Sequence, residues 1–333
     1  MTSIIEMPEL VLEKIIGFSD FKSVLTLRQV CRDFRNFLDD LKDSKLPDSK
    51  FETIEIIVDK NNIVLDFKEF GVFSHRHEYS EFGRSKNYRR KKTVFESSNF
   101  VDVAIRDLEL VLKFQKSRLE RLYFDVDGFQ LSPDSLLHDF PVKLSNMFKM
   151  LNQRIKTENF TIKTYNQSQI MRFIPFADPD ALQKLILLSK NNKMKLEIDE
   201  MAKTEQWKNA QEIQCNFPVL NLKVEDIYYF SRISLLMKII SARDLENMRK
   251  ACISSSKFEY AVFNLTFFNG NEEILNCWGN PCYTASSFNW YFRIKDLEEK
   301  VLHIEFCGTF INFQTIDLRH VLAGAIVQDY KEN

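Results

Sequence analysis

Glycine is scarce in this sequence, and its eight copies in 333 residues form neither a GxGxxG nor a GxxxxGKS/T pattern. The glycine-rich loops that bind phosphate groups are therefore excluded. No stretch approaches about 18 uninterrupted apolar residues, so we expect no membrane-spanning helix. The N-terminus has no basic region followed by an apolar run, so we expect no secretory signal. A formal net charge of −1 gives the whole chain no preference for nucleic acid or acidic membranes.

Cysteine and histidine are also sparse, and their spacing predicts no metal or catalytic site. The six cysteines lack a disulfide framework, so we expect reduced thiols and a location in the cytoplasm, the nucleus or both. Cys277 and Cys282 have no second pair nearby to complete a zinc site. His75 and His77 flank Arg76, which opposes a cation, and no further ligand is evident. We therefore expect no enzyme, no cofactor and no metal.

Phenylalanine, by contrast, is abundant, with 30 copies against 10 tyrosines and 3 tryptophans. It supplies ample core volume and argues against extensive disorder. At this length the chain has room for a small domain and a large one.

The first fifty residues predict three short helices. Pro8 suits a first helical turn, where its missing N–H would have no partner anyway. Gly17 and Ser19-Asp20 break this helix, and Asp20 can accept hydrogen bonds at the start of the next one. Apolar residues recur at helical spacing in all three segments: Leu12, Ile15 and Ile16, then Val24, Leu27 and Cys31, then Phe34, Phe37, Leu38 and Leu41.

This segment resembles an F-box, a module with a Leu-Pro start, a helix of spaced aliphatics and a closing Val-Cys-Arg-x-aromatic element. The matching residues are Met7-Pro8, Leu12, Ile15, Ile16, Leu25, Val30-Cys31-Arg32 and Phe34. The chain departs from the pattern at Met7, where Leu is usual, and at Phe34, where Trp is frequent. The resemblance implies an F-box over residues 1–45 that docks on the Skp-type adaptor of a cullin-RING ubiquitin ligase.

A unit of roughly 40 residues seldom buries enough apolar surface to be stable alone, which favours a partner surface. A small helical subdomain packed on the rest of the same chain is the alternative. The residues expected to contact the adaptor are Pro8, Leu12, Ile15, Ile16, Leu25, Val30 and Phe34.

Residues 46–134 predict a polar connection, a hairpin over 51–70, a loop over 71–97 and a first helix-strand unit. The loop carries the one basic cluster of the chain: Arg84, Lys86, Arg89, Arg90, Lys91 and Lys92, interleaved with Tyr79, Phe82 and Tyr88. Such a cluster can bind nucleic acid, attract an acidic substrate or act as a nuclear localisation signal. It can equally be a solvated loop.

Helix-strand pairs recur after residue 100, with strands expected over 119–125 and 159–165, around Leu185 and Leu187, and around Ile213 and Cys215. Helices are expected over 100–116, 144–155, 198–210, 224–240 and 242–254. Together with the N-terminal helices, this predicts an α/β protein: a three-helix F-box followed by a curved helix/strand repeat domain of the leucine-rich-repeat kind.

Within this region, residues 135–270 resemble the FTH domain, which follows the F-box in a large group of nematode F-box proteins. The most specific match is Glu205-Gln206-Trp207-Lys208-Asn209-Ala210. The resemblance implies a module for protein–protein contact. Residues 271–333 predict further strands, including one over 272–278, and a final helix over 315–330.

These observations predict the substrate-recognition subunit of an SCF-type ligase, with a Skp-type adaptor, through it a cullin, and a target protein as partners. The alternative is a nucleic-acid-associated or other interaction adaptor that uses residues 84–92. A hydrolase or transferase hidden in the C-terminal part would require a deep pocket with converging titratable groups.

Overall fold

A computed structural model describes residues 4–71, 74–81, 83–88, 91–95, 99–126, 135, 137–151, 153–165, 167–191, 194–266, 268 and 270–329. The chain divides into two compact units, residues 1–158 and residues 159–333. Within the described ranges, no helix combines the length and the apolar character needed to cross a bilayer.

Unit 1 begins with three short helices, as predicted. They are α1 (Glu9–Phe18), α2 (Phe21–Val30) and α3 (Arg32–Asp40), flanked by the 3-10 turns η1 (Ile4–Glu6) and η2 (Asp43–Lys45). Asp20 begins α2 because its Oδ1 accepts a hydrogen bond from the Ser23 N–H at 2.7 Å. Gly17 does not break α1, which continues to Phe18.

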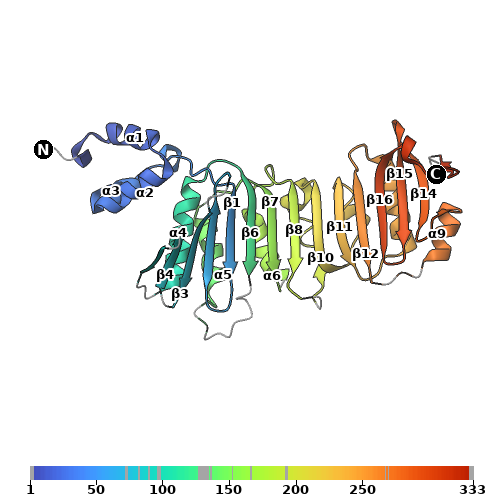
Figure 1. Cartoon of the computed structure of the whole chain (residues 1–333), viewed down its shortest axis with the longest axis horizontal. Helices are drawn as coiled ribbons and strands as arrows, with labels where there is room; N and C mark the ends of the chain where they lie inside the picture. Colours follow the sequence, from blue (N-terminus) through green and yellow to red (C-terminus); the bar gives the residue numbers. More distant parts are fainter. Residues whose placement is uncertain are drawn as a thin grey trace. The chain divides into compact units, whose positions relative to one another are not determined.

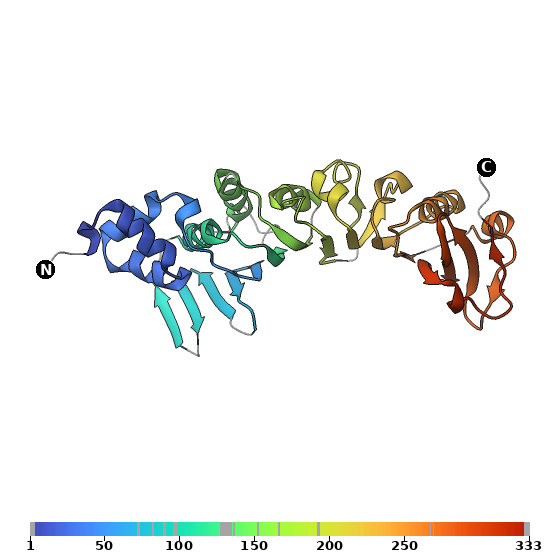
Figure 2. The same ribbon diagram turned by 90° about the horizontal axis from the view of Figure 1, so that it is seen from above.

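A mixed sheet and two covering helices form the rest of unit 1 (Figures 1 and 2). The strands are β1 (Thr53–Val58), β2 (Ile63–Lys68), β3 (Ser74–Ser80), β4 (Gly83–Tyr88), β5 (Lys91–Phe95) and β6 (Leu119–Val126), and the helices are α4 (Phe100–Phe114) and α5 (Phe140–Leu151). β1 pairs with β6 in parallel and with β2 antiparallel, and β3, β4 and β5 extend the antiparallel part. The predicted hairpin over 51–70 is confirmed.

The prediction of a loop over 71–97 is wrong, because β3, β4 and β5 lie there. The buried side of β3 carries histidine imidazoles and a tyrosine phenol instead of aliphatic side chains. His77 and Tyr79 are both buried, and the Tyr79 hydroxyl donates to Asp107 Oδ2 on α4 at 2.6 Å. The alternation is real, but polar atoms on both faces hide it from a hydrophobicity pattern.

The connection between the helices and the sheet is fixed at Asp48. Its Oδ1 accepts hydrogen bonds from the backbone N–H groups of Lys50 and Lys116 at 3.1 and 3.0 Å, and its Oδ2 accepts one from Ser117 at 3.1 Å. Burial raises the pKa of Asp48, but these backbone hydrogen bonds outweigh burial and lower the pKa overall.

Aromatic packing strengthens the same junction. The ring of Phe21 on α2 makes edge contacts with Phe51 and Phe114, at centroid distances of 5.6 and 5.1 Å. All three side chains are buried. The predicted polar connection therefore joins the three helices to the sheet through a packed junction.

Unit 2 is built on a parallel ladder. Its strands and helices are β7 (Thr157–Thr164), α6 (Gln167–Phe173), η4 (Ile174–Phe176), β8 (Lys184–Ser189), β9 (Leu196–Glu197), α7 (Glu205–Asn209), β10 (Glu212–Leu220), η5 (Val224–Asp226), β11 (Arg232–Met237), α8 (Ala242–Ser254) and β12 (Tyr260–Leu265). β7, β8, β10, β11 and β12 pair in this order, all in parallel.

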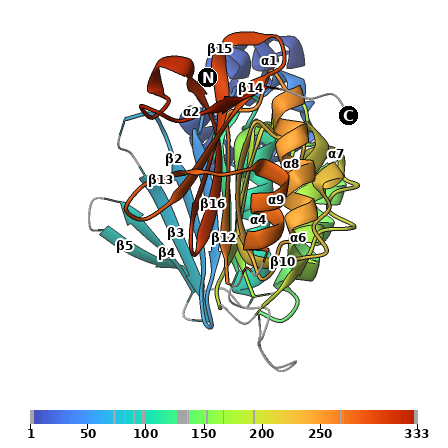
Figure 3. The same ribbon diagram turned by 90° about the vertical axis from the view of Figure 1, so that its right-hand side faces the viewer.

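An antiparallel group completes unit 2. It contains α9 (Asn271–Trp278), β13 (Cys282–Tyr283), β14 (Phe288–Ile294), β15 (Leu297–Cys307), β16 (Phe310–Asp317), η6 (Leu318–His320) and β17 (Val327–Gln328). β16 pairs antiparallel with β12 and with β15, and β14 follows β15. In Figure 3, α8 and α9 lie on one side of β12 and β16.

Two rows of side chains, matched residue by residue through the strand register, make the core of unit 2. One row is Phe160, Leu185, Ile213, Ile233, Ala261 and Phe313, and the next is Ile162, Leu187, Cys215, Leu235, Phe263 and Ile311. All of them are buried. Because alternate residues of a strand point to opposite faces, the ladder has one apolar, helix-covered face and one open face.

Three element predictions in unit 2 are wrong. Residues 224–240 were expected to be helical but contain η5 and β11, residues 272–278 belong to helix α9 instead of a strand, and residues 315–330 contain the end of β16, η6 and β17 instead of a helix. The predicted helix over 198–210 shortens to α7. Apolar runs such as Ile233-Ser234-Leu235-Leu236-Met237 fit the helical and the strand periodicity equally well. Pairing with neighbouring strands therefore decides whether such a run becomes a helix or a strand.

The mixed α/β class with N-terminal helices and a large sheet region is therefore confirmed. The curvature and the leucine-rich-repeat character stay predictions, as do the domain limits 1–45, 46–134, 135–270 and 271–333.

We predict that Asp48→Ala lowers the free energy of unfolding by about 1–3 kcal/mol, because the backbone N–H groups of Lys50, Lys116 and Ser117 lose a charged acceptor. Asp48→Asn should lose less of this free energy, since the amide oxygen still accepts hydrogen bonds. The lowered pKa means that the carboxylate stabilises the fold above its unfolded pKa and that this contribution is lost as the pH falls through the folded pKa. Urea unfolding at pH 7 and at pH 3 should therefore show a smaller Asp48→Ala effect at pH 3, and an equal effect would contradict the assignment.

Candidate functional site

The three N-terminal helices keep the predicted contact residues in three different environments. Leu12, Ile16 and Phe34 are buried within unit 1, where they support the helices. Ile15 and Leu25 are half-buried, and Pro8 and Val30 are exposed. The structure therefore separates the list into side chains that hold the helices together and side chains that are open to a partner.

Several exposed apolar side chains on the same segment are absent from the list of expected contact residues. They are Ile4, Met7, Leu10, Val11 and Phe18. Leu10 and Phe18 are eight residues apart and therefore share a face of α1, and Met7 and Val11 are four apart. The sequence signal that could have identified these side chains is a second apolar stripe along α1, opposite the buried pair Leu12 and Ile16.

Cys31, in the Val-Cys-Arg element of the F-box pattern, caps a helix. It ends α2 and begins α3, and its Sγ accepts a hydrogen bond from the Phe34 N–H at 3.5 Å. Arg28 joins the same two helices through Asp39, with Nε to Oδ1 at 2.8 Å and Nη2 to Oδ2 at 3.0 Å. These contacts fix the junction of α2 and α3, where Val30 is the last residue of α2.

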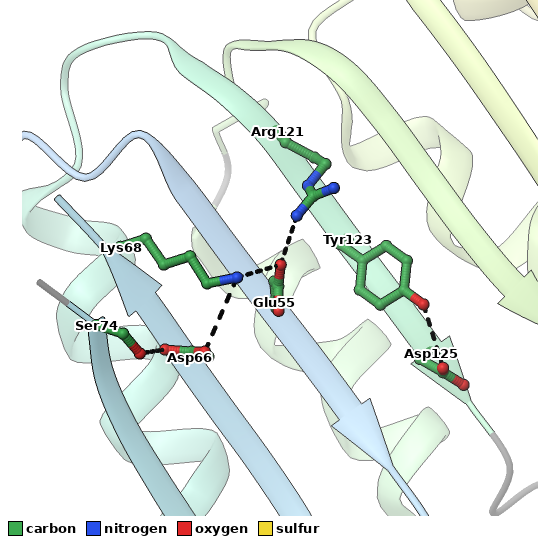
Figure 4. A network of polar contacts seen from close by, with 7 residues as sticks. All are labelled: Glu55, Asp66, Lys68, Ser74, Arg121, Tyr123 and Asp125. Atoms are coloured by element: carbon green, nitrogen blue, oxygen red, sulfur yellow. Dashed lines mark hydrogen bonds and ion pairs between the residues drawn. The ribbon is translucent and has the colours of Figure 1, made fainter. Parts of the chain in front are cut away.

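A polar network occupies the open face of the sheet in unit 1 (Figure 4). Glu55 on β1 is nearly buried and accepts hydrogen bonds from Lys68 Nζ at 2.7 Å and from Arg121 Nη2 at 2.6 Å. Asp66 accepts a hydrogen bond from the Ser74 hydroxyl, and its Oδ2 lies 4.0 Å from Lys68 Nζ. Carboxylates and cations alternate across β1, β2 and β6, so the network links strands.

Tyr123 on β6 extends this network. Its hydroxyl donates to Asp125 Oδ2 at 3.2 Å. Burial and the negative charge of Asp125 raise the pKa of Tyr123 to about 12. The phenol is therefore a hydrogen-bond donor at neutral pH and not a base.

The basic cluster falls partly on strands. Arg84 and Lys86 lie on β4, Lys91 and Lys92 lie on β5, and Arg89 and Arg90 lie outside the described residues. The nucleic-acid alternative stays a prediction.

The histidine pair takes part in packing and hydrogen bonding. His75 Nε2 lies 3.2 Å from Glu69 Oε1, and the His77 ring stacks on Tyr79 with centroids 6.5 Å apart. In the part of the chain that the structure describes, no group of three or more His, Cys, Asp and Glu side chains could hold a metal ion.

The Glu205–Ala210 element has a structural role in unit 2. Thr204 caps α7 by accepting a hydrogen bond from the Trp207 N–H at 3.2 Å. Gln206 Nε2 donates to the Ala177 carbonyl at 2.8 Å, and Trp207 Nε1 donates to the Asp226 carbonyl at 2.7 Å. Both side chains are buried, so Gln206 and Trp207 join neighbouring loops and are not themselves open to a partner.

Comparison with protein families agrees with these two regions. The model of the F-box domain matches residues 4–46, and the model of the FTH domain matches residues 138–277. No curated protein and no solved structure matches the chain. The chain therefore contains an F-box domain and an FTH domain, as the resemblances implied. An F-box domain in general indicates a non-catalytic adaptor role in SCF-type ubiquitin ligases, with a Skp-type subunit as its partner.

We predict that Tyr123 does not ionise between pH 10 and 11, where an exposed tyrosine does. Absorbance at 295 nm, recorded as the difference between the wild-type chain and Tyr123→Phe, should show no step until the pH nears about 12. Because the pKa is raised on folding, the stability that Tyr123 contributes is present below pH 10 and is lost as the pH rises towards 12. A one-tyrosine step centred near pH 10 would contradict the environment described for this phenol.

Proposed function

We propose that this chain is the substrate-recognition subunit of an SCF-type cullin-RING ubiquitin ligase. Its F-box domain binds the Skp-type adaptor, and its FTH domain binds the target protein. The chain performs no chemistry of its own, and its location is the cytoplasm, the nucleus or both.

The exposed apolar surface of the F-box helices is the observation that carries this proposal. Met7, Leu10, Val11 and Val30 are open to solvent on a segment of fewer than fifty residues. Each such aliphatic side chain contributes roughly 1.5–3 kcal/mol when a partner buries it fully. Of the expected contact residues, Pro8 is also exposed, Ile15 and Leu25 are half-buried, and the buried Leu12, Ile16 and Phe34 support the helices.

The proposed mechanism is proximity. The adaptor connects the F-box to the cullin and to the ubiquitin-charged conjugating enzyme, while the FTH domain holds the target on the same chain. Tethering replaces a collision in solution by an intramolecular encounter, with an effective concentration of roughly millimolar for a short link. The hydrogen bonds at Asp48 support this role because they keep the F-box helices joined to the first sheet.

The FTH domain works as a leucine-rich-repeat-like ladder whose open face is available for protein contact. The chain is one of the nematode F-box proteins that carry an FTH domain.

We predict that Leu10→Asp combined with Val30→Asp abolishes capture of a purified Skp-type adaptor by the full chain. The expected loss is at least about a hundredfold in Kd, because each central apolar contact is worth about 2 kcal/mol and about 1.4 kcal/mol is tenfold. Both side chains are exposed, at 71% and 64%, so the variant should keep its thermal stability.

Met150→Asp combined with Ile239→Asp is the matched control, since these apolar side chains are 79% and 60% exposed but lie outside the F-box. It should capture the adaptor like the wild type. Leu12→Ala combined with Ile16→Ala should also lose the adaptor, but with about 2–5 kcal/mol lost per site from the stability of the helices. No capture by the wild-type chain, or equal capture by the Leu10→Asp, Val30→Asp variant, would contradict the proposal.

A further inference from the structure

A polar groove of about 830 Å³ lies in unit 2, at the ends where β10, β11 and β12 begin. The turns that precede these three strands form its floor, and β15 and β16 supply residues to its wall. This volume is within the range of roughly 300–1,000 Å³ typical of ligand sites. The groove is therefore large enough to receive a short segment of another chain.

Positive charge dominates this groove. Lys208, Lys257 and Lys300 line it, each from a different element, and all three are exposed. We call it the lysine groove after these residues. Within the described ranges, none of the three lysines takes part in an ion pair.

Glu259 is the carboxylate among the described residues that line the groove, and Arg232 already neutralises its charge. Arg232 Nε lies 2.7 Å from Glu259 Oε2, and Arg232 Nη2 lies 3.3 Å from Oε1. Glu212 bridges Arg232 and Lys184 on the neighbouring strands, at 3.6 and 2.6 Å. The charges along the strand ends are thus balanced, and the three lysines remain as an uncompensated excess.

Backbone groups at the floor of the groove are satisfied internally. The Ser231 N–H donates to the Gln211 carbonyl, and the Glu259 N–H donates to the Ser231 carbonyl, both at 2.9 Å. The Thr315 N–H donates to the Glu259 carbonyl at 2.9 Å. An incoming ligand therefore meets mainly side chains: the lysines, and the rings of Tyr229 and Tyr260, a residue type enriched at protein interfaces.

We propose that the lysine groove binds an acidic segment, rich in Asp and Glu, of the target protein. This inference rests on the proposed function and deepens it, because it assigns a place on the FTH domain and a chemistry to the target. Three lysines around a groove with low-dielectric walls concentrate a positive field, which attracts carboxylates and raises the rate of encounter. A nucleic-acid strand fits less well, since its binding depends on neutralising many phosphates along the backbone and the groove offers only these three lysines.

Fluorescence anisotropy with the full chain tests this assignment. The probes are a labelled decapeptide of alternating Asp and Glu with glycine spacers, its Asn/Gln counterpart, and a single-stranded oligonucleotide of equal charge. The acidic peptide should bind best, and its affinity should fall as salt rises. Lys208→Glu, Lys257→Glu and Lys300→Glu together should weaken it by about threefold to a hundredfold, the fold-change that corresponds to three lost exposed pairs of about 0.2–1 kcal/mol each.

The control variant combines Lys195→Glu, Lys223→Glu and Lys238→Glu. It makes the same charge change in unit 2 at exposed lysines near the opposite ends of β10 and β11. It should bind the acidic peptide within about twofold of the wild type, because exposed charges beyond a Debye length of about 10 Å are screened. A Lys→Gln version of the groove variant removes the charges without reversing them and should show a smaller loss in the same direction.

The assignment is overturned if the acidic peptide does not bind, if both triple variants bind it equally, or if the amide peptide or the oligonucleotide binds as tightly. Adaptor capture by the same samples keeps the two proposals distinguishable. The groove variant should capture the adaptor normally, because the F-box is unchanged. Peptide binding without adaptor capture would remove the ligase role and leave the groove assignment standing, and the reverse result would remove the groove alone.

Discussion

The burial of alternate strand residues against helices is the constraint on which the rest of this protein depends. In unit 2 it produces two buried rows across β7, β8, β10, β11, β12 and β16, and a shift of one residue in any strand would turn its apolar set to the wrong face. In unit 1 the same alternation buries Ile54 and Ile56 while Glu55 between them joins the network on the open face. Apolar content is thus concentrated on one face, and the other face is left to polar residues.

The polar faces and strand ends are consequently where this chain can interact without disturbing its core. Their charges are mostly balanced, as in the contacts of Glu55 with Lys68 and Arg121. Among the described residues, the F-box helices depart from this rule with exposed aliphatic side chains, and the lysine groove departs from it with exposed positive charge. The two surfaces therefore differ in chemistry, one being apolar and the other electrostatic.

Elements with strong local signals could be predicted from the sequence. Pro8 and Asp20 mark helix starts through backbone chemistry that needs no tertiary context, and the hairpin at residues 51–70 alternates cleanly. β3 and β11 could not be predicted in this way. Tyr79 and His77 pack as apolar groups, although their polar atoms hide them from a hydrophobicity pattern. The run at Ile233–Met237 fits helix and strand alike until neighbouring strands select one.

α9 had a usable signal, since Ile274 and Trp278 are four residues apart and both buried, with Glu272 and Glu273 in the first turn. The exposed apolar side chains of the F-box were only partly predictable, because periodicity marks Leu12 and Ile16 as apolar without saying which apolar side chains are buried and which are exposed.

The most direct test of the central claim is hydrogen–deuterium exchange of the full chain with and without a purified Skp-type adaptor. The account predicts that slowed exchange upon adaptor binding is concentrated in residues 4–46, strongest in α1 and at the end of α2, with the parallel strands of unit 2 unchanged. Protection centred on unit 2, or none in α1, would contradict the account, because the exposed apolar side chains of the F-box would then not be the adaptor contact.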